Sequence, residues 1–282
     1  MSNAVKNIKE EKQKCRPFLK WAGGKAKLLQ SLTPLLPKQY NNYFEPFIGG
    51  GALFFYLQPK RAYISDLNSE LVNCYLCIRN NPVKVIEYLK KHIYEKEYFY
   101  KLREIAKFTE YENWSNEQKA ARLIYLNKTC FNGLYRVNKK GEFNVPFGRY
   151  KNPLICDEKN IYLCSQALKK VNISLEDFSN TKSKLQENDF IYLDPPYVPI
   201  SKSSNFTSYT LENFDIKQQE NLSKFCKEIT AKGVKFMLSN SSSDLVHNLY
   251  KDFNSFTVNA PRSINSKIKM RNDVEELVIT NY

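Results

Sequence analysis

Histidine is nearly absent from this chain: His92 and His247 are the only two in 282 residues. The seven cysteines are scattered, and the single C-x-x-C pair, Cys74 with Cys77, has no second pair or histidine cluster to complete a zinc site. We therefore expect reduced cysteines that pack in the interior, and no metal. Catalysis by a Ser/His or Cys/His pair is disfavoured, so any enzymatic chemistry must work without them.

Long hydrophobic runs are also missing. No stretch approaches the roughly 18 apolar residues of a membrane span, and the charged N-terminus has no apolar segment behind it. We expect a cytoplasmic protein outside the membrane. Lys and Arg number 43 against 29 Asp and Glu, a net charge of +14, while 42% of the residues are hydrophobic. This composition predicts a folded protein attracted to polyanions, either nucleic acid or an anionic membrane surface.

Strand and helix patterns alternate at both ends of the chain, which predicts an α/β fold with a largely parallel sheet. The helical patterns lie at 52–58, 69–80, 215–231 and 243–252. The strand patterns lie at 42–47, 62–66, 171–178, 189–194, 235–241, 256–260 and 275–282.

The alternation of strand and helix patterns is interrupted between residues 82 and 168. Helical patterns at 82–92, 95–107 and 115–131 lead into a Gly- and Asn-rich segment, 132–150, that reads as a β-hairpin. We predict an inserted domain at 82–168, which leaves 1–81 and 169–282 as the core. From 119 to 151 the chain carries eight basic residues and one acid, residues 1–27 carry eight basic and two acidic residues, and the stretch 262–271 adds four basic ones. Three basic stretches interleaved with aromatics favour a nucleic-acid groove over a merely solvated face.

A glycine-rich turn follows the first expected strand. Residues 47–51 read Phe-Ile-Gly-Gly-Gly and open a helix, and Asp66 ends the next strand. Such a turn lets a ligand approach the carboxyl edge of the sheet, where an acid can bond ribose hydroxyls. Phe54 stands where a dinucleotide fingerprint needs glycine, and the GGK at 23–25 lacks the flanking residues of a P-loop. A nucleoside without a pyrophosphate therefore fits better than NAD or ATP.

The motif Asp194-Pro195-Pro196-Tyr197 ends the apolar strand 189–194. Two prolines stop the strand and fix a rigid turn. They hold a carboxylate and a backbone carbonyl at the sheet edge beside an aromatic ring. The Asp194 carboxylate and the Pro195 carbonyl could each accept one N–H of an exocyclic amino group, while Tyr197 stacks on the base. A plain strand-terminating turn is the alternative, and the glycine-rich turn upstream favours the catalytic interpretation.

Several long sequence motifs of this chain resemble those of the Dam family of DNA adenine-N6 methyltransferases, the D12 class. They occur in family order from about residue 16 to the C-terminus: FLKWAGGK (18–25), FEPFIGGGALFF (44–55), DLNSEL (66–71), NGLYRVNKKGEFNVPFGRYKNP (132–153), YLDPPY (192–197), NFTSYT (205–210) and LSNSSS (238–243). The resemblance implies a Rossmann-like S-adenosylmethionine-dependent core with an inserted, mainly helical target-recognition domain that carries a β-hairpin. It also implies S-adenosyl-L-methionine as cofactor and GATC in double-stranded DNA as target.

The resemblance carries cofactor-binding roles onto this sequence. Trp21, Lys25, Asp66 and Asp194 match the family's cofactor contacts, and Phe47, Gly49 and Gly51 form the turn beside them. Asp177 and Phe178 match the position that holds the cofactor's adenine ring, although Glu176 stands where the family pattern has glycine.

Roles toward DNA follow in the same way. Lys20 would contact the outer guanine, Arg136 would read a guanine, and Leu134 and Pro146 would contact the thymine region. Phe131 and Asn132 would fill the space left by a flipped base, although the family often has tyrosine at the first of these positions. Lys139, Lys140 and Arg149 would contact phosphates; an internal salt bridge is the alternative role for Arg136.

The implied reaction is direct in-line methyl transfer to a base flipped out of the duplex, with no covalent enzyme intermediate. A monomer acting on a palindromic site is expected, with a cognate restriction endonuclease as a functional partner or with none. The alternatives are an RNA or protein-glutamine methyltransferase, which usually has Asn in place of Asp194, and a DNA-binding regulator without catalysis.

Overall fold

The structure is a computed structural model that describes residues 15–21, 23–138, 140–197, 214–260 and 274–282. Three features of the sequence analysis lie outside the described residues: the motif NFTSYT at 205–210, the basic stretch at 262–271, and Lys139.

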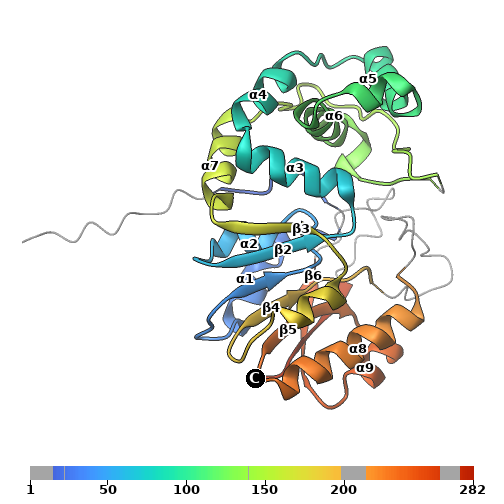
Figure 1. Cartoon of the computed structure of the whole chain (residues 1–282). Helices are drawn as coiled ribbons and strands as arrows, with labels where there is room; N and C mark the ends of the chain where they lie inside the picture. Colours follow the sequence, from blue (N-terminus) through green and yellow to red (C-terminus); the bar gives the residue numbers. More distant parts are fainter. Residues whose placement is uncertain (1–14, 22, 139, 198–213, 261–273) are drawn as a thin grey trace, which may run out of the picture.

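A seven-stranded sheet forms the centre of the molecule (Figure 1). The strands β1 to β5 are parallel, as predicted, and β7 runs antiparallel between β5 and β6. The order across the sheet is β3-β2-β1-β4-β5-β7-β6. The strands are β1 (Tyr43–Glu45), β2 (Ala62–Asp66), β3 (Val171–Leu175), β4 (Phe190–Leu193), β5 (Lys235–Ser241), β6 (Asn254–Ala260) and β7 (Val274–Thr280).

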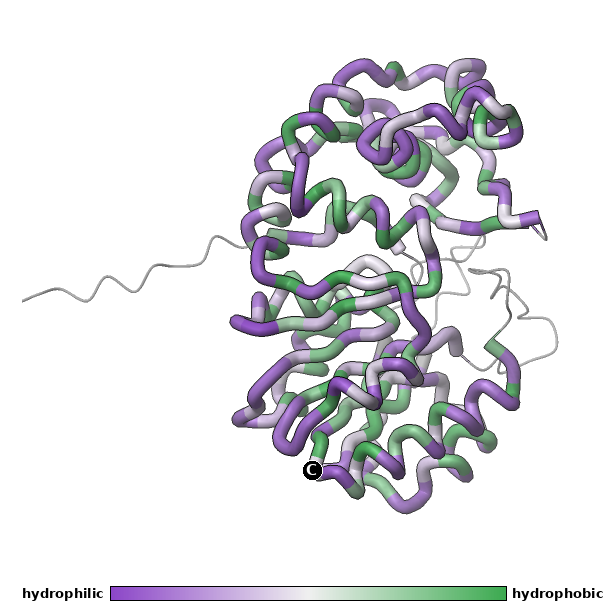
Figure 2. The backbone as a smooth tube through the Cα atoms, in the orientation of Figure 1, coloured by the Kyte–Doolittle hydropathy of each residue, from purple (hydrophilic) through white to green (hydrophobic). Residues whose placement is uncertain are grey.

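Helices cover both faces of this sheet because neighbouring strand residues point to opposite sides. In β1, Tyr43 belongs to one hydrophobic cluster and Phe44 to another. The first cluster includes residues of α1 (Leu29–Leu32), α2 (Ala52–Leu57) and α3 (Ser69–Asn80), and the second includes residues of α8 (Ile216–Ala231) and α9 (Asp244–Leu249). Polar and apolar residues alternate along α3 and α8 in Figure 2, as expected for helices with one buried face.

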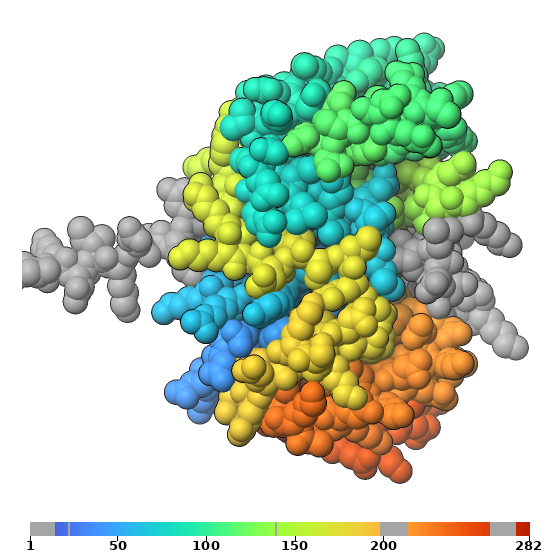
Figure 3. All heavy atoms as spheres, viewed as in Figure 1, coloured from blue at the N-terminus to red at the C-terminus, as the bar shows by residue number. Residues whose placement is uncertain are grey.

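The segment inserted after α3 is mainly helical and lies beyond the β3 edge of the sheet (Figures 1 and 3). It comprises α4 (Pro82–Lys90), α5 (Lys96–Glu104), α6 (Asn116–Thr129) and α7 (Glu158–Leu168). The sequence patterns did not predict α7, which begins at an Asp157 cap that accepts a hydrogen bond from the Asn160 N–H. Both α6 and α7 pack on α3, so the buried side chains of the insertion continue those on one face of the sheet.

Several predicted elements are shorter in the structure, among them the helix expected at 243–252, which is Asp244–Leu249, and for two of them the local structure gives the reason. The strand expected at 171–178 ends at Leu175, because Asp177 caps the 3₁₀ helix η6 (Phe178–Ser183) by accepting a hydrogen bond from the Ser179 N–H. The hairpin at 132–150 turns at Gly141, whose φ is +78°, and is held by two isolated bridges, Val137 with Phe143 and Cys130 with Phe147. The insertion therefore carries a narrow ribbon in place of two extended strands.

Candidate functional site

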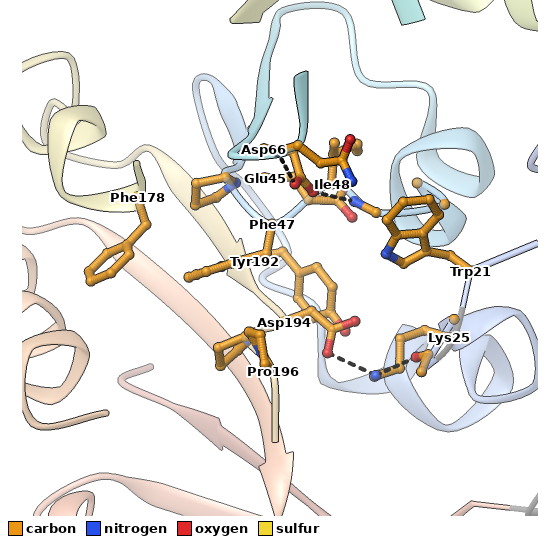
Figure 4. Close-up of a pocket in the computed structure, with 18 of the residues that line it drawn as sticks. Trp21, Lys25, Glu45, Phe47, Ile48, Asp66, Phe178, Tyr192, Asp194 and Pro196 are labelled. Carbon is orange, nitrogen blue, oxygen red and sulfur yellow. Dashed lines mark hydrogen bonds and ion pairs between the residues drawn. The ribbon is translucent and has the colours of Figure 1, made fainter. Parts of the chain in front are cut away.

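A pocket opens at the carboxyl ends of the parallel strands, where α/β sheets commonly bind ligands. The ends of β1, β2 and β4 contribute Glu45, Asp66 and Asp194 to its lining. Figure 4 shows Asp66 and Asp194 in the middle of the pocket, with Phe178 at one side and Trp21 at the other. All twelve residues predicted for catalysis or cofactor binding line this pocket: Trp21, Lys25, Phe47, Gly49, Gly51, Asp66, Asp177, Phe178, Asp194, Pro195, Pro196 and Tyr197.

The glycine-rich turn forms one wall of the pocket. Gly49 and Gly51 both have positive φ, +46° and +68°. A Cβ atom on Gly51 would lie 2.6 Å from Tyr75 Oη, and one on Gly49 would lie 2.8 Å from Trp21 Cδ1. Both the backbone conformation and the close packing therefore require glycine here. The Tyr75 hydroxyl donates to the Gly49 carbonyl at 2.9 Å, which fixes the turn against α3.

Asp66 is oriented by this same turn. Its two carboxylate oxygens accept hydrogen bonds from the Gly49 N–H, at 3.1 Å, and from the Asn68 N–H, at 3.0 Å. Burial raises the pKa of Asp66 to about 6, and the hydrogen bonds partly oppose that rise. The carboxylate is thus held rigidly at the pocket wall, in reach of a polar ligand group.

Aromatic rings line the two sides of the pocket. Phe47 and Phe178 lie nearly parallel, with ring centroids 5.5 Å apart, and Phe178 is buried. On the opposite side Trp21 stacks on Tyr135 of the insertion, with centroids 4.8 Å apart. The Trp21–Tyr135 stack connects the pocket directly to the inserted segment, a link that no sequence pattern indicated.

Lys25 forms a charged cluster with the residues that follow β4. Lys25 Nζ lies 2.8 Å from Asp194 Oδ1, donates to the Gly23 carbonyl at 2.7 Å and sits 4.7 Å from the centroid of the Tyr197 ring. Only 3% of the Lys25 side chain is exposed. Burial raises the pKa of Asp194 to about 6, although the Lys25 ammonium opposes the rise. The Pro196 carbonyl accepts a hydrogen bond from buried Gln219 at 3.0 Å, which braces the turn.

Two further acids belong to this site and were missed by the sequence analysis. Glu45 is buried at the end of β1, accepts a hydrogen bond from the Tyr43 hydroxyl at 2.7 Å, and has its pKa raised to about 8 by burial. Glu276 of β7 accepts a hydrogen bond from the Tyr197 hydroxyl at 2.6 Å. An acid at the end of an apolar strand could have singled out Glu45, whereas nothing local in the sequence singles out Glu276.

Apart from Lys139, which is outside the described residues, the residues predicted to contact DNA lie outside the pocket, on the insertion and next to it. Phe131 and Asn132 are exposed in a short turn, and Asn132 has a φ of +56°. Lys20 packs on Gly133 of the same turn, where a Cβ atom would come within 2.3 Å of Lys20 Cδ. Buried Asn127 holds the two segments together: its side chain accepts from the Lys20 N–H and donates to the carbonyls of Lys20 and Gly133.

The hairpin carries most of the remaining predicted contacts. Arg136 donates through Nε to the Asn144 side chain at 2.7 Å and through Nη2 to the Asn144 carbonyl at 3.3 Å. The internal salt bridge considered as the alternative role of Arg136 would need an acid. The partners that Arg136 has here are the amide oxygen and the backbone carbonyl of Asn144. Lys140, Pro146 and Arg149 are exposed, and Leu134 is partly buried.

The described residues contain no cluster of three or more His, Cys, Asp or Glu arranged to hold a metal ion. Within the same ranges, no helix is long and apolar enough to cross a membrane. Cys74 and Cys77 are buried in α3, in keeping with the packing role expected for them.

Known proteins match this chain over nearly its whole length. The model of the D12 class N6 adenine-specific DNA methyltransferases matches residues 21–264. Type II methyltransferase M1.LlaDCHI of Lactococcus lactis is 46% identical over 279 residues, covering 98% of each chain. Type II methyltransferase M.MjaIII of Methanocaldococcus jannaschii is 45% identical over 95% of this chain and 99% of its own. A DNA adenine methylase of Serratia marcescens is 33% identical over 94% of this chain and 98% of its own.

Proposed function

Because the chain belongs to the D12 class N6 adenine-specific DNA methyltransferases, we propose that it methylates N6 of adenine in double-stranded DNA, within GATC, with S-adenosyl-L-methionine as the methyl donor. The observation that carries the proposal is the position of Asp194. Its carboxylate ends a central parallel strand, lies beside the Tyr197 ring and shares one pocket with Asp66. A carboxylate, an aromatic ring and a second acid that could bind a ribose thus line one pocket, which supports the proposal.

The pocket lining fits this cofactor. Asp66, held by two backbone N–H groups, would accept hydrogen bonds from the ribose hydroxyls, and Phe47, Asp177 and Phe178 would contact the adenine end. Trp21 and Lys25 would hold the methionine end. S-adenosylmethionine supplies a methyl group already activated on a sulfonium, so the chain needs no nucleophile, metal or histidine of its own.

Asp194 and its neighbours would act on the target base. The Asp194 carboxylate and the Pro195 carbonyl would each accept one N–H of the amino group, which localises the nitrogen lone pair and aims it along the transfer direction. Tyr197 would stack on the base, since adenine must leave the duplex to reach this pocket. Because Lys25 Nζ lies 2.8 Å from Asp194 Oδ1, the Asp194 carboxylate would accept hydrogen bonds from both the lysine and the adenine amino group.

The insertion, 82–168, would recognise the DNA. A two-stranded ribbon can enter the major groove, where each base pair presents a distinct pattern of donors and acceptors. Arg136, Leu134 and Pro146 would read base edges, with Lys20 at the outer guanine, while Phe131 and Asn132 would fill the gap left by the flipped base. Lys139, Lys140 and Arg149 would contact phosphates.

We further propose that the enzyme acts as a monomer in the cytoplasm, as the modification partner of a restriction endonuclease that cuts the same site. The pairing with an endonuclease is supported by the higher identity, 46% and 45%, to two proteins named type II methyltransferases than to the DNA adenine methylase, at 33%. The family assignment disfavours an RNA or protein-glutamine methyltransferase, and the intact pocket disfavours a regulator without catalysis.

The test combines product chemistry with site mapping. The purified protein is incubated with S-adenosylmethionine and plasmid DNA that lacks adenine methylation, the nucleosides are analysed by mass spectrometry, and modified positions are mapped by single-base detection. N6-methyladenine confined to GATC is the expected product. Methylated cytosine, or no product, would contradict the reaction; N6-methyladenine at another sequence would contradict only the target site.

A further inference from the structure

The topology of the sheet brings one residue of β7 to the pocket. The parallel strands end at the pocket edge, whereas the antiparallel β7 begins there. Glu276, near the start of β7, pairs in register with Ser241, the last residue of β5. A residue close to the C-terminus of the chain therefore lies beside Asp194 and Tyr197, which follow β4.

The contacts of Glu276 join it to the charged cluster. Its Oε2 atom accepts a hydrogen bond from the Tyr197 hydroxyl at 2.6 Å and lies 3.9 Å from Lys25 Nζ. Its side chain is only 13% exposed. Hydrogen bonds to a carboxylate in such a partly buried place are short and strong. The same Lys25 ammonium pairs with Asp194, so the two acids, the lysine and the tyrosine form one network.

Tyr197 needs this anchor for a geometric reason. A phenol ring can rotate about its Cβ–Cγ bond without moving its hydroxyl oxygen, which lies on that axis. Because conjugation keeps the O–H bond in the ring plane, a hydrogen bond to a fixed acceptor favours the ring orientation whose plane contains that acceptor. The Lys25 ammonium contacts the ring through its π-system, not through the hydroxyl, so it sets the distance to the ring more than the tilt of the ring. The acceptor for the Tyr197 hydroxyl is the Glu276 carboxylate, so its position sets the ring orientation that this hydrogen bond favours.

We propose that Glu276 is a positioning residue for methyl transfer, whose carboxylate holds the Tyr197 ring in the plane that stacks on the target adenine. The inference rests on the proposed function, because it assigns Glu276 a part in that reaction. It predicts that loss of Glu276 slows the transfer step and leaves the binding of cofactor and DNA nearly unchanged.

The test measures single-turnover methylation of a duplex by the full chain, with saturating S-adenosylmethionine, for Glu276→Ala, Glu276→Gln and Tyr197→Phe. The matched control is Glu275→Ala, which removes the exposed neighbouring acid on the same strand. We expect Glu276→Ala to slow transfer about 10- to 100-fold, the range that a small misplacement of reacting groups produces. Dissociation constants for cofactor and DNA should stay within about threefold of wild type, because positioning enters the rate and not the binding step. Glu276→Gln should recover most of the rate, since its amide oxygen can still accept the tyrosine hydrogen bond.

A double-mutant cycle separates positioning from a general structural effect. If Glu276 acts through the Tyr197 hydroxyl, Tyr197→Phe combined with Glu276→Ala should be no slower than the slower single variant. The inference would be overturned if the rate losses of the two single variants multiplied in the double variant, or if Glu276→Ala were as fast as Glu275→Ala. The proposed function would stand in either case, provided that the wild-type enzyme is active. If Glu276→Ala does not fold, a Glu276→Gln rate below that of Tyr197→Phe would overturn it, and the reverse order would support it. An inactive wild-type enzyme would overturn the proposed function and this role with it.

Discussion

Lys25 and Asp194 form a largely buried ion pair, with 2.8 Å between Nζ and Oδ1, where the segment after Gly23 and Gly24 meets the end of strand β4. The Lys25 ammonium favours the ionised form of Asp194 and so opposes the rise in pKa that burial causes. It also places a cation against the Tyr197 ring, so one lysine influences both the charge and the geometry of the proposed adenine site.

Replacing Lys25 should change the pH dependence of methylation. Asp194 has a pKa of about 6, raised by burial and opposed by Lys25, and the proposed reaction needs its carboxylate form. In Lys25→Met the opposing charge is gone, so the pKa rises and activity is lost at a higher pH than in wild type, by about one unit. The measurement is single-turnover rate against pH at saturating cofactor, with exposed Lys27→Met as control. An acid limb that stays in place or moves to lower pH would refute this role.

Asp66 should control cofactor affinity in a pH-dependent way. Its pKa of about 6 means that binding of S-adenosylmethionine weakens as the pH falls through 6, because the protonated group loses much of its strength as a hydrogen-bond acceptor. Asp66→Asn should bind the cofactor about tenfold more weakly at pH 7.5, with little pH dependence between 5 and 7.5. Titration calorimetry at several pH values checks both points. Equal pH dependence in the two proteins would show that another group is responsible.

Asn127 should be important for stability because its buried side chain makes three hydrogen bonds to backbone groups of Lys20 and Gly133. Asn127→Ala leaves those groups without their partner, and we expect a loss of about 2–4 kcal/mol in the free energy of unfolding. Urea denaturation measures it, with exposed Asn180→Ala as the matched control. A loss no larger than that of the control would mean that other groups hold the two segments together.

Arg136 and Lys140 should affect DNA binding differently. Arg136→Ala should relax the preference at one base pair, by about 1–3 kcal/mol, since base-edge contacts carry specificity. Lys140→Ala should weaken binding to all sequences alike and lower the slope of log K against log salt by about one. Binding to GATC and to single-base variants at several salt concentrations distinguishes them. A uniform loss for Arg136→Ala would assign it to the phosphate backbone instead.

The sequence was sufficient to predict the parallel sheet and the pocket, because both depend on local signals. Alternating strand and helix patterns placed Asp66 and Asp194 at strand ends, and parallel strand ends share one edge. Glu276 and Tyr135 could not be predicted in the same way. Glu276 depends on β7 inserting between β5 and β6, and Tyr135 depends on the insertion folding back onto Trp21. Both are contacts between distant segments, which no periodicity in the sequence encodes.

The most direct test of the central claim is the methylation activity of Asp194→Ala on a GATC duplex, measured beside its affinity for the same DNA. If Asp194 holds the adenine amino group, the rate should fall by at least about a thousandfold, the size of effect seen when a preorganised polar group at a reacting atom is removed. The dissociation constant for DNA should change only a few-fold, because Asp194 would contact a single base and none of the other described residues predicted to contact DNA lines its pocket. Methylation at the wild-type rate in Asp194→Ala would contradict the account.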